Sequence, residues 1–287
     1  MFKSVISKLL RIKTLEQKLK NFYSVQNGLS SSEIEAIIAN GEIWLFSQMK
    51  TGTTFLCNVL AFYNANINGL HNIHFGNIEN AGIGRGSGIY SKTLSGLMKF
   101  RRDHRAHILI HTHNYLPNCA PEFLVCTTRN PMDYAVSYYY FHYINRKNIN
   151  NMVIDDVLPK IINNFIKTYK MQSEAAKKCE KVIKIRYEEL MTDTSNTISN
   201  LIRQIYTVND ESAIQKAIKH ASPENLKRFE REQGQAIVAK AGTLKKQHFI
   251  RSGKIGEGKD FFTIEQQQLI ANMLEVENIP ISGDFNF

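Results

Sequence analysis

A short polar stretch, Lys50-Thr51-Gly52-Thr53-Thr54, carries the residue types that bind anions. It lies between an apolar segment, Ile43–Phe46, that predicts a short buried strand and a helix predicted over 54–63 from apolar residues at helical spacing. Backbone N–H groups are free at a helix start, and the helix dipole adds partial positive charge there. Lys50 adds a full charge and the threonines add hydroxyl donors. The stretch therefore predicts an anion-binding loop, with a capped helix start as the structural alternative.

The order of residues in this loop excludes the Walker A pattern. Walker A places four residues between its glycine and a Gly-Lys-Ser/Thr end, whereas Lys50 precedes Gly52 here.

A second cluster follows the apolar segment Phe123–Thr128, a predicted strand. Arg129 comes at the strand end, and Pro131 favours the first turn of a helix, where a missing N–H costs little. Ser137 follows one to two turns into that helix, predicted over 133–146. A guanidinium fork and a hydroxyl near a helix start suit a phosphate monoester, although a surface arginine before an aromatic helix remains the alternative.

Another strand is predicted over His107–His111. It ends on His111, and His113 follows two residues later. An imidazole whose pKa is near neutral can accept a hydroxyl proton at physiological pH, which makes His113 a candidate general base. The alternatives are a structural histidine, or a metal held by His111 and His113, because residues two apart share a strand face. No third ligand is evident in the sequence, so no metal is expected.

These elements predict an α/β fold. Apolar strands at 43–46, 107–111, 123–128 and 182–187 alternate with helices at 54–63, 133–146, 153–177 and 196–207. That alternation predicts three layers, a central parallel sheet flanked by helices, with ligands at the carboxyl ends of the strands. Residues 26–287 are expected to form one domain. Residues 64–105, rich in Asn and Gly, are expected to be a mobile loop and a candidate lid.

Composition narrows the class of partner but does not identify one. The 287 residues are 43% hydrophobic and 22% charged, as in ordinary globular proteins, and the net charge of +10 favours anionic partners. A basic amphipathic helix is predicted within residues 1–25, its pattern running over 1–23; it either lies on an anionic membrane surface or packs on the domain. With no apolar stretch long enough to span a bilayer and four scattered cysteines, a cytoplasmic location is expected, with membrane association left open.

Three motifs in order resemble one family. Lys50-Thr51-Gly52-Thr53-Thr54 resembles the 5′-phosphosulfate loop of sulfotransferases that use 3′-phosphoadenosine 5′-phosphosulfate (PAPS). The segment 129–141 matches every fixed position of the cytosolic-type pattern Arg-Asn-Pro-x-Asp-x-x-Val-Ser-x-Tyr-x-Phe. The segment 251–263 resembles the C-terminal Arg-Lys-Gly-x-x-Gly-Asp-Trp-Lys-Asn-x-Phe-Thr, with Ser252 in place of lysine and Gly258 in place of tryptophan. The resemblance implies a P-loop NTPase-like fold.

The resemblance also assigns residues. The catalytic candidates are Lys50, His113 and Ser137, where His113 deprotonates the acceptor, Lys50 stabilises the departing phosphate oxygen, and Ser137 restrains Lys50. The donor-binding candidates are Lys50, Thr51, Gly52, Thr53, Thr54, Phe55, Arg129, Ser137, Tyr187, Ser222, Leu226, Phe249, Arg251, Ser252 and Gly253.

The implied reaction moves a sulfuryl group from PAPS to a hydroxyl or amine, giving 3′-phosphoadenosine 5′-phosphate (PAP), without a metal. The acceptor, a small molecule, lipid or glycan, has no readable motif. The rival interpretations are a P-loop kinase of a small hydroxylated substrate and a nucleotide-binding protein without catalysis; nucleic acid is not an expected partner, because no stacking or zinc pattern accompanies the charge. Residues Lys259–Gln268 resemble the family's dimer motif, but Gln268 lacks its terminal charge, so a homodimer stays open.

Overall fold

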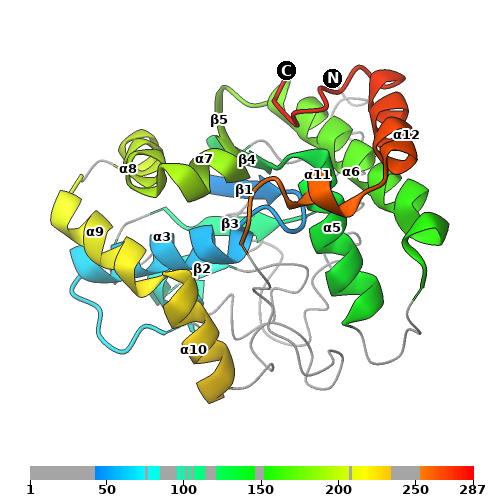
Figure 1. The fold of residues 1–287 in the computed structure, drawn as a ribbon. Coiled ribbons are helices and arrows are strands. Elements are labelled where there is room, and N and C mark those ends of the chain that lie inside the picture. The colour runs from blue at the N-terminus through cyan, green and yellow to red at the C-terminus, as the bar shows by residue number, and fades with distance from the viewer. Residues whose placement is uncertain are drawn as a thin grey trace, which may run out of the picture.

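A computed structural model describes residues 43–74, 77–84, 96–97, 99–100, 103–104, 107–113, 121–145, 152–206, 209–233 and 253–287. Their centre is a five-stranded sheet in the order β2-β3-β1-β4-β5, in which every neighbouring pair is parallel (Figure 1). The strands are β1 (Ile43–Ser47), β2 (Ile83–Gly84), β3 (Leu109–Thr112), β4 (Phe123–Thr128) and β5 (Lys181–Arg186).

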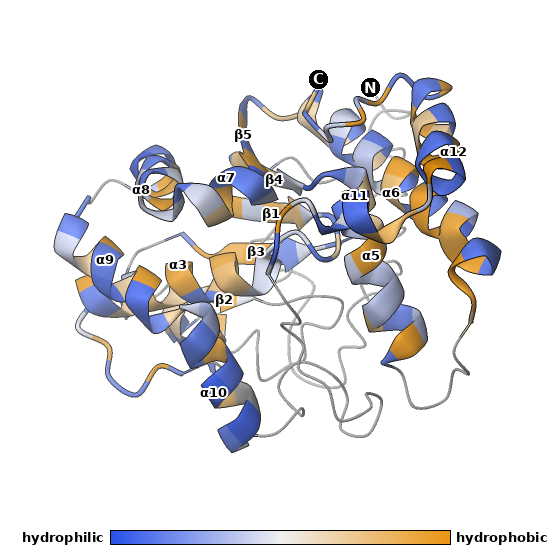
Figure 2. Ribbon diagram, viewed as in Figure 1, coloured by the Kyte–Doolittle hydropathy of each residue, from blue (hydrophilic) through white to orange (hydrophobic). Residues whose placement is uncertain are grey.

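The central strand is β1, with β3 on one side and β4 on the other. Its residues are all buried, as are those of β3 and β4, which explains their nearly continuous apolar runs. Chain order reverses at β1, the position where open parallel sheets bind ligands beyond their carboxyl ends. Figure 2 shows the hydrophobic colouring along β1, against the largely hydrophilic colouring of α10.

Helices cover both faces of this sheet. Side chains of α3, α7, α8 and α9 form one core with Leu45, Val125 and Ile183 from the strands. On the other side, α5, α6 and α12 share a second core, and Gln172 of α6 donates hydrogen bonds to the carbonyls of Phe46 (2.7 Å) and Thr127 (2.9 Å). These contacts give the expected three layers.

The helical elements are α3 (Thr53–Ile67), η1 (Ile78–Ala81), α5 (Pro131–Tyr139), η2 (Tyr140–Ile144), α6 (Ile154–Ala176), α7 (Tyr187–Thr192), α8 (Thr194–Ile205), α9 (Glu211–His220), α10 (Pro223–Gln233), α11 (Glu257–Phe261) and α12 (Ile264–Glu275). No helix within the described ranges combines the length and apolar character needed to cross a bilayer.

Two features differ from the sequence expectation. The segment 64–105, expected to be a mobile loop, contains η1 and β2, and β2 pairs with β3 through Ile83↔Leu109. Only two residues long, preceded by Gly82 and ending on Gly84, β2 is too short to show strand periodicity. The expected helix over 133–146 is instead α5 followed by the π-helical turn η2. The expected N-terminal helix lies outside the described residues.

Candidate active site

The loop between β1 and α3 has the backbone of an anion site. Lys50 has a φ of 63° and Gly52 a φ of 80°, so left-handed residues alternate with others just before the first turn of α3. Gly52 is required, because a Cβ there would lie 2.9 Å from Leu190 Cδ2 and 3.2 Å from Tyr187 Cδ2. The Thr51 hydroxyl is not a free donor: it donates to the Gln48 carbonyl (2.7 Å) and lies 2.6 Å from Thr127 Oγ1.

The carboxyl ends of β1 and β3 bring together Ser47, His111 and His113, here called the imidazole corner. Sheet register pairs Phe46 with Thr112, so the next residues, Ser47 and His113, lie level with one another. His113 Nδ1 lies 2.9 Å from the Ser47 carbonyl oxygen and 3.2 Å from Ser47 Oγ. Since a carbonyl oxygen only accepts, His113 carries its proton on Nδ1 and its lone pair on Nε2.

The surroundings of His113 favour its neutral form. Burial lowers the pKa of the imidazole from its ordinary value, and the positive charge of Lys50 lowers it further, while the hydrogen bond to Ser47 acts in the opposite direction. A neutral imidazole with an unprotonated Nε2 is the state that a general base requires.

The carboxyl end of β4 forms a second group, Arg129, Asp133, Gly256 and Gly258, here called the arginine corner. Arg129 is only 4% exposed, and its guanidinium donates to the carbonyls of Lys50 (3.3 Å) and Lys254 (2.8 Å). The same group stacks over the Tyr187 ring at 4.0 Å and lies 4.0 Å from Asp133. One buried side chain thus joins the anion loop, the end of β5 and the C-terminal loop.

Asp133 anchors the C-terminal loop to α5. Its two carboxylate oxygens each accept a backbone N–H, from Gly256 and from Gly258, both at 2.7 Å. Gly258 is packed so closely that a Cβ there would lie 2.5 Å from the Met132 carbonyl carbon. The glycine that stands where the family pattern has tryptophan is therefore a close helix–loop contact.

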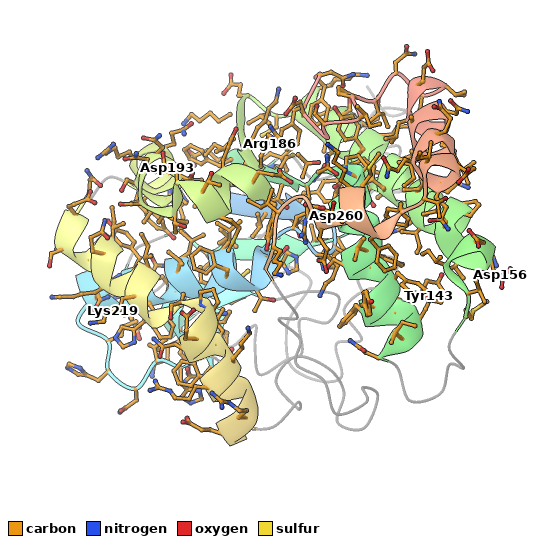
Figure 3. All side chains as sticks on the ribbon, viewed as in Figure 1. Tyr143, Asp156, Arg186, Asp193, Lys219 and Asp260 are labelled. Carbon is orange, nitrogen blue, oxygen red and sulfur yellow. The ribbon has the colours of Figure 1, made fainter. Side chains whose placement is uncertain are left out.

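The start of α5 explains why Asn130 and Pro131 follow Arg129. The Asn130 side chain accepts from the N–H groups of Met132 (3.0 Å) and Asp133 (3.3 Å), and Pro131 occupies the first turn. The Asn130 N–H is bound by Glu188 Oε1 at 2.8 Å. Arg186, labelled in Figure 3 where β5 meets α7, pairs with Glu188 and with Asp284 of the C-terminal tail.

Lys50 faces the far end of the α5–η2 segment. Its Nζ lies 4.3 Å from the centre of the Phe141 ring. Ser137 is partly buried one turn earlier, within α5. The π-helical turn shifts the residues after Ser137 relative to a regular helix, and such turns are frequent at functional sites.

The remaining candidates are placed as follows. Thr53, Thr54 and Phe55 form the first turn of α3, Tyr187 begins α7 with 6% exposure, and Gly253 has a φ of 72° beside the Tyr187 hydroxyl. Ser222 and the buried Leu226 lie where α9 meets α10. The roles of these residues stay predictions. Phe249, Arg251 and Ser252 lie outside the described residues.

Two of the buried polar atoms without a partner lie at this sheet edge. Within the described part of the chain, Thr53 Oγ1 and Arg129 Nε are buried without a hydrogen-bond partner. One lies in the first turn of α3 and the other on the fork that reaches the anion loop. Buried polar groups usually have partners, and these two are available to a ligand. No cluster of potential metal ligands occurs among the residues that the structure describes.

Sequence reasoning missed four participants. Ser47 reads as the last residue of a buried strand, and Asp133 matches a motif without a stated role. His111 had no role beyond a metal alternative. Gly283, with a φ of 77°, approaches so closely that a Cβ would lie 2.4 Å from the Arg129 carbonyl oxygen.

The described residues form an α/β fold with a polar loop, two histidines and a buried arginine at one edge of the sheet. The chain belongs to the sulfotransferase domain family, whose model matches residues 40–279, and is therefore a transferase of that class. Its fold is similar to that of retinol dehydratase, crystallised in complex with androsterone and inactive cofactor PAP, at 18% identity over 85% of this chain and 84% of that one (TM-score 0.56). It is also similar to mouse sulfotransferase SULT7A1 complexed with PAP, at 16% identity over 87% and 90% (TM-score 0.54).

Proposed function

We propose that this chain transfers the sulfuryl group of PAPS to a hydroxyl or amine of an acceptor and releases PAP. The observation that carries the proposal is Arg129, a buried guanidinium that reaches the Lys50 carbonyl and the Lys254 carbonyl at once and keeps Nε unpaired. In the proposal, the 3′-phosphate, which distinguishes PAPS from adenosine 5′-phosphosulfate, binds between these loops. The PAP found in both similar structures supports the same donor.

In this proposal the anion loop holds the 5′-phosphosulfate. The backbone from Lys50 to Thr54 and the Thr53 hydroxyl bind its oxygens, while Tyr187 and Phe55 flank the adenine. Arg129 and Ser137, with Gly253 and the predicted Arg251 and Ser252, bind the 3′-phosphate, and Phe249 is a further predicted donor contact. Ser222 and Leu226 complete the base site. No metal is needed, since the charge is met by Lys50, Arg129 and helix N–H groups.

The chemistry is an in-line displacement at sulfur. Nε2 of His113 takes the acceptor proton as the acceptor oxygen or nitrogen bonds to sulfur, and the bond from sulfur to the 5′-phosphate oxygen breaks. Negative charge grows on that phosphate oxygen, where the Lys50 ammonium stabilises it. In this proposal Lys50 leaves the Phe141 ring for the bridging oxygen, and Ser137 restrains that movement until the acceptor binds.

Radiolabelled PAPS tests donor and acceptor together. The full chain is incubated with [³⁵S]PAPS and a panel of phenols, steroid alcohols, sugars, hydroxylated lipids and amines. Label on at least one acceptor is expected, with no requirement for magnesium. Phosphoryl transfer from ATP with magnesium would instead support a kinase, and PAP binding without transfer to any panel member would support a non-catalytic nucleotide-binding protein.

Replacing Lys50 by alanine separates catalysis from binding. Loss of a donor placed where charge develops costs about 10²- to 10³-fold in turnover. We expect that loss for Lys50→Ala in single-turnover transfer, with PAP affinity nearly unchanged. Lys216→Ala removes the same charge from the exposed face of α9 and should leave both values as in the wild type.

Peripheral membrane contact through residues 1–23, a cytoplasmic location and a homodimer through Lys259–Gln268 remain proposals. Within that last segment Ile264 is 82% exposed, which leaves an apolar side chain available to a second copy. Vesicle sedimentation with and without residues 1–23 tests the first, and sedimentation velocity of the wild type and Ile264→Asp tests the dimer.

A further inference from the structure

The imidazole corner contains a second histidine that the proposed reaction does not use. His111 is 7% exposed on β3, and its Nε2 lies 2.8 Å from Ser47 Oγ. That hydroxyl lies 3.2 Å from His113 Nδ1, and the two rings meet edge to face with centroids 4.5 Å apart. One fully buried serine therefore touches both imidazoles.

The acceptors present allow one continuous set of hydrogen bonds along this chain. His113 Nδ1 faces two oxygens of Ser47, one of which is a carbonyl, so Nδ1 bears a hydrogen. When Ser47 Oγ accepts from that hydrogen, its own hydrogen is left to donate. His111 Nε2, at 2.8 Å, is an acceptor within reach. The sequence of bonds is then His113 Nδ1–H to Ser47 Oγ–H to His111 Nε2.

We propose that His111 and Ser47 form a proton relay that takes the acceptor's proton away from the catalytic base. The proposal rests on the proposed sulfuryl transfer. The acceptor O–H breaks and a hydrogen forms on His113 Nε2; His113 Nδ1–H passes to Ser47 Oγ; the original Ser47 hydrogen passes to His111 Nε2. His113 ends neutral in its other tautomer and His111 ends as the cation. Ser47 Oγ gains one proton and gives one, His113 gains a proton on Nε2 and loses one from Nδ1, and His111 carries the one proton that the acceptor has lost; no electrons are exchanged.

The charge distribution makes this transfer useful. An imidazolium at His113 would form within the field of Lys50, whose positive charge already disfavours protonation there. His111 lies two residues earlier on β3, level with Leu45 of β1. The relay therefore moves the proton from His113, whose protonation the charge of Lys50 disfavours, to the next imidazole along the strand.

The hydrogen positions can be measured directly. Histidine labelled with ¹³C and ¹⁵N in the full chain, saturated with PAP, reports the tautomer of each ring by NMR, and His111→Gln and His113→Gln assign the two signals. We expect both rings to be neutral at pH 7.5 with the proton on Nδ1. A proton on His111 Nε2 would overturn the relay, because Ser47 could then not donate to it. Failure of PAP to bind would count against the proposed function instead, and the tautomers can still be read in that case.

A double-mutant cycle tests the relay in catalysis. Ser47→Ala keeps the backbone carbonyl that fixes the His113 tautomer, and His111→Gln keeps a polar side chain but cannot take up a proton. Each should slow single-turnover transfer from [³⁵S]PAPS to 4-nitrophenol by about 10- to 100-fold, a part of the usual contribution of proton transfer. The double variant should be no slower than either single variant. Additive losses would overturn the relay.

Matched controls separate this effect from folding. Ser199→Ala removes a buried serine of α8, and His107→Gln removes an exposed histidine just before β3. Both should transfer at the wild-type rate. The NMR signal of His113 in Ser47→Ala must still show a proton on Nδ1; a changed tautomer would mean that Ser47 acts only by orienting the base, which contradicts the relay.

Discussion

The imidazole corner and the arginine corner lie at one edge of the same sheet but are held by different means. Side chains hold the first: Ser47 joins His111 and His113, and the sheet register of β1 and β3 sets their spacing. The second is held by backbone groups of distant segments, two N–H groups on Asp133 and two carbonyls on Arg129. The second also contains a charged pair, Arg129 and Asp133.

We expect the imidazole corner to act in the reaction and the arginine corner to hold the fold and the donor site together. In the proposed reaction the imidazole corner changes its protonation at each turnover. The charged corner is part of the fold: Arg129 and Asp133 are both nearly inaccessible, and loops from residues 50, 187 and 254 meet on them. Substitutions in the first should reduce rate and leave stability, and those in the second should reduce both stability and donor affinity.

The largest expected effect lies in the imidazole corner. His113→Ala should reduce single-turnover transfer by about 10²- to 10⁴-fold, the usual contribution of a general base. PAP affinity by calorimetry and the melting temperature should change little, because Ser47 and His111 can still bond to one another. Near-normal turnover in this variant would show that His113 is not the base.

Arg129→Lys should have its main effect on the donor. Lysine keeps the charge but loses the fork that reaches two carbonyls and stacks on Tyr187. We expect about a 10- to 100-fold loss of affinity for PAP, the size of one or two charge-assisted hydrogen bonds. Binding of adenosine 5′-phosphosulfate, which lacks the 3′-phosphate, should fall less. An equal loss for both nucleotides would remove the 3′-phosphate role.

How much of these corners could be predicted depends on how far apart their residues are in sequence. Local patterns predict the four longer strands, three of the flanking helices and the polar residues at strand ends. Strand β4 begins and ends at the predicted residues. The contact between Asp133 and Gly258 joins segments 125 residues apart, and nothing local in either marks it. Strand β2 was missed because pairing with β3, rather than its own sequence, makes it a strand.

The contact between His111 and Ser47 was not predicted, for the same reason. His111 looks like an ordinary inward-facing strand residue, and only the register of β1 against β3 brings Ser47 to it. Conversely, the loop Lys50–Thr54 was recognised because all of its anion-binding groups are adjacent. The sequence predicts chemistry that adjacent residues provide together, whereas it does not predict contacts that depend on the pairing of distant strands.

A pair of glycines tests the assembly role of the arginine corner. Gly258→Ala places a Cβ 2.5 Å from two atoms of Met132, so helix and loop must separate. Overpacking of this kind costs about 1–3 kcal/mol, which lowers the melting temperature by a few degrees. Gly256→Ala is the control: its φ of 82° strains a side chain, but no atom lies within 4 Å of the Cβ, so about 1 kcal/mol is expected. Equal losses would argue against the close contact.

The smallest effect concerns pH. Because burial and Lys50 lower the pKa of His113, the base should stay neutral down to pH values below the ordinary histidine range, and turnover should fall only on the acid side of that range. Lys50→Gln removes one of the two causes, so the His113 pKa measured by NMR should rise. A fall or no change would place the Lys50 charge too far away to act.

The close approach of Gly283 to the Arg129 carbonyl has a consequence for how the molecule folds. Arg129 is enclosed by segments around residues 50, 187, 254 and 283, so its surroundings are complete only after loops of roughly 60 to 150 residues have closed. Contacts of such long sequence separation form slowly. Refolding from denaturant should therefore regain helical circular dichroism first and the ability to bind PAP later.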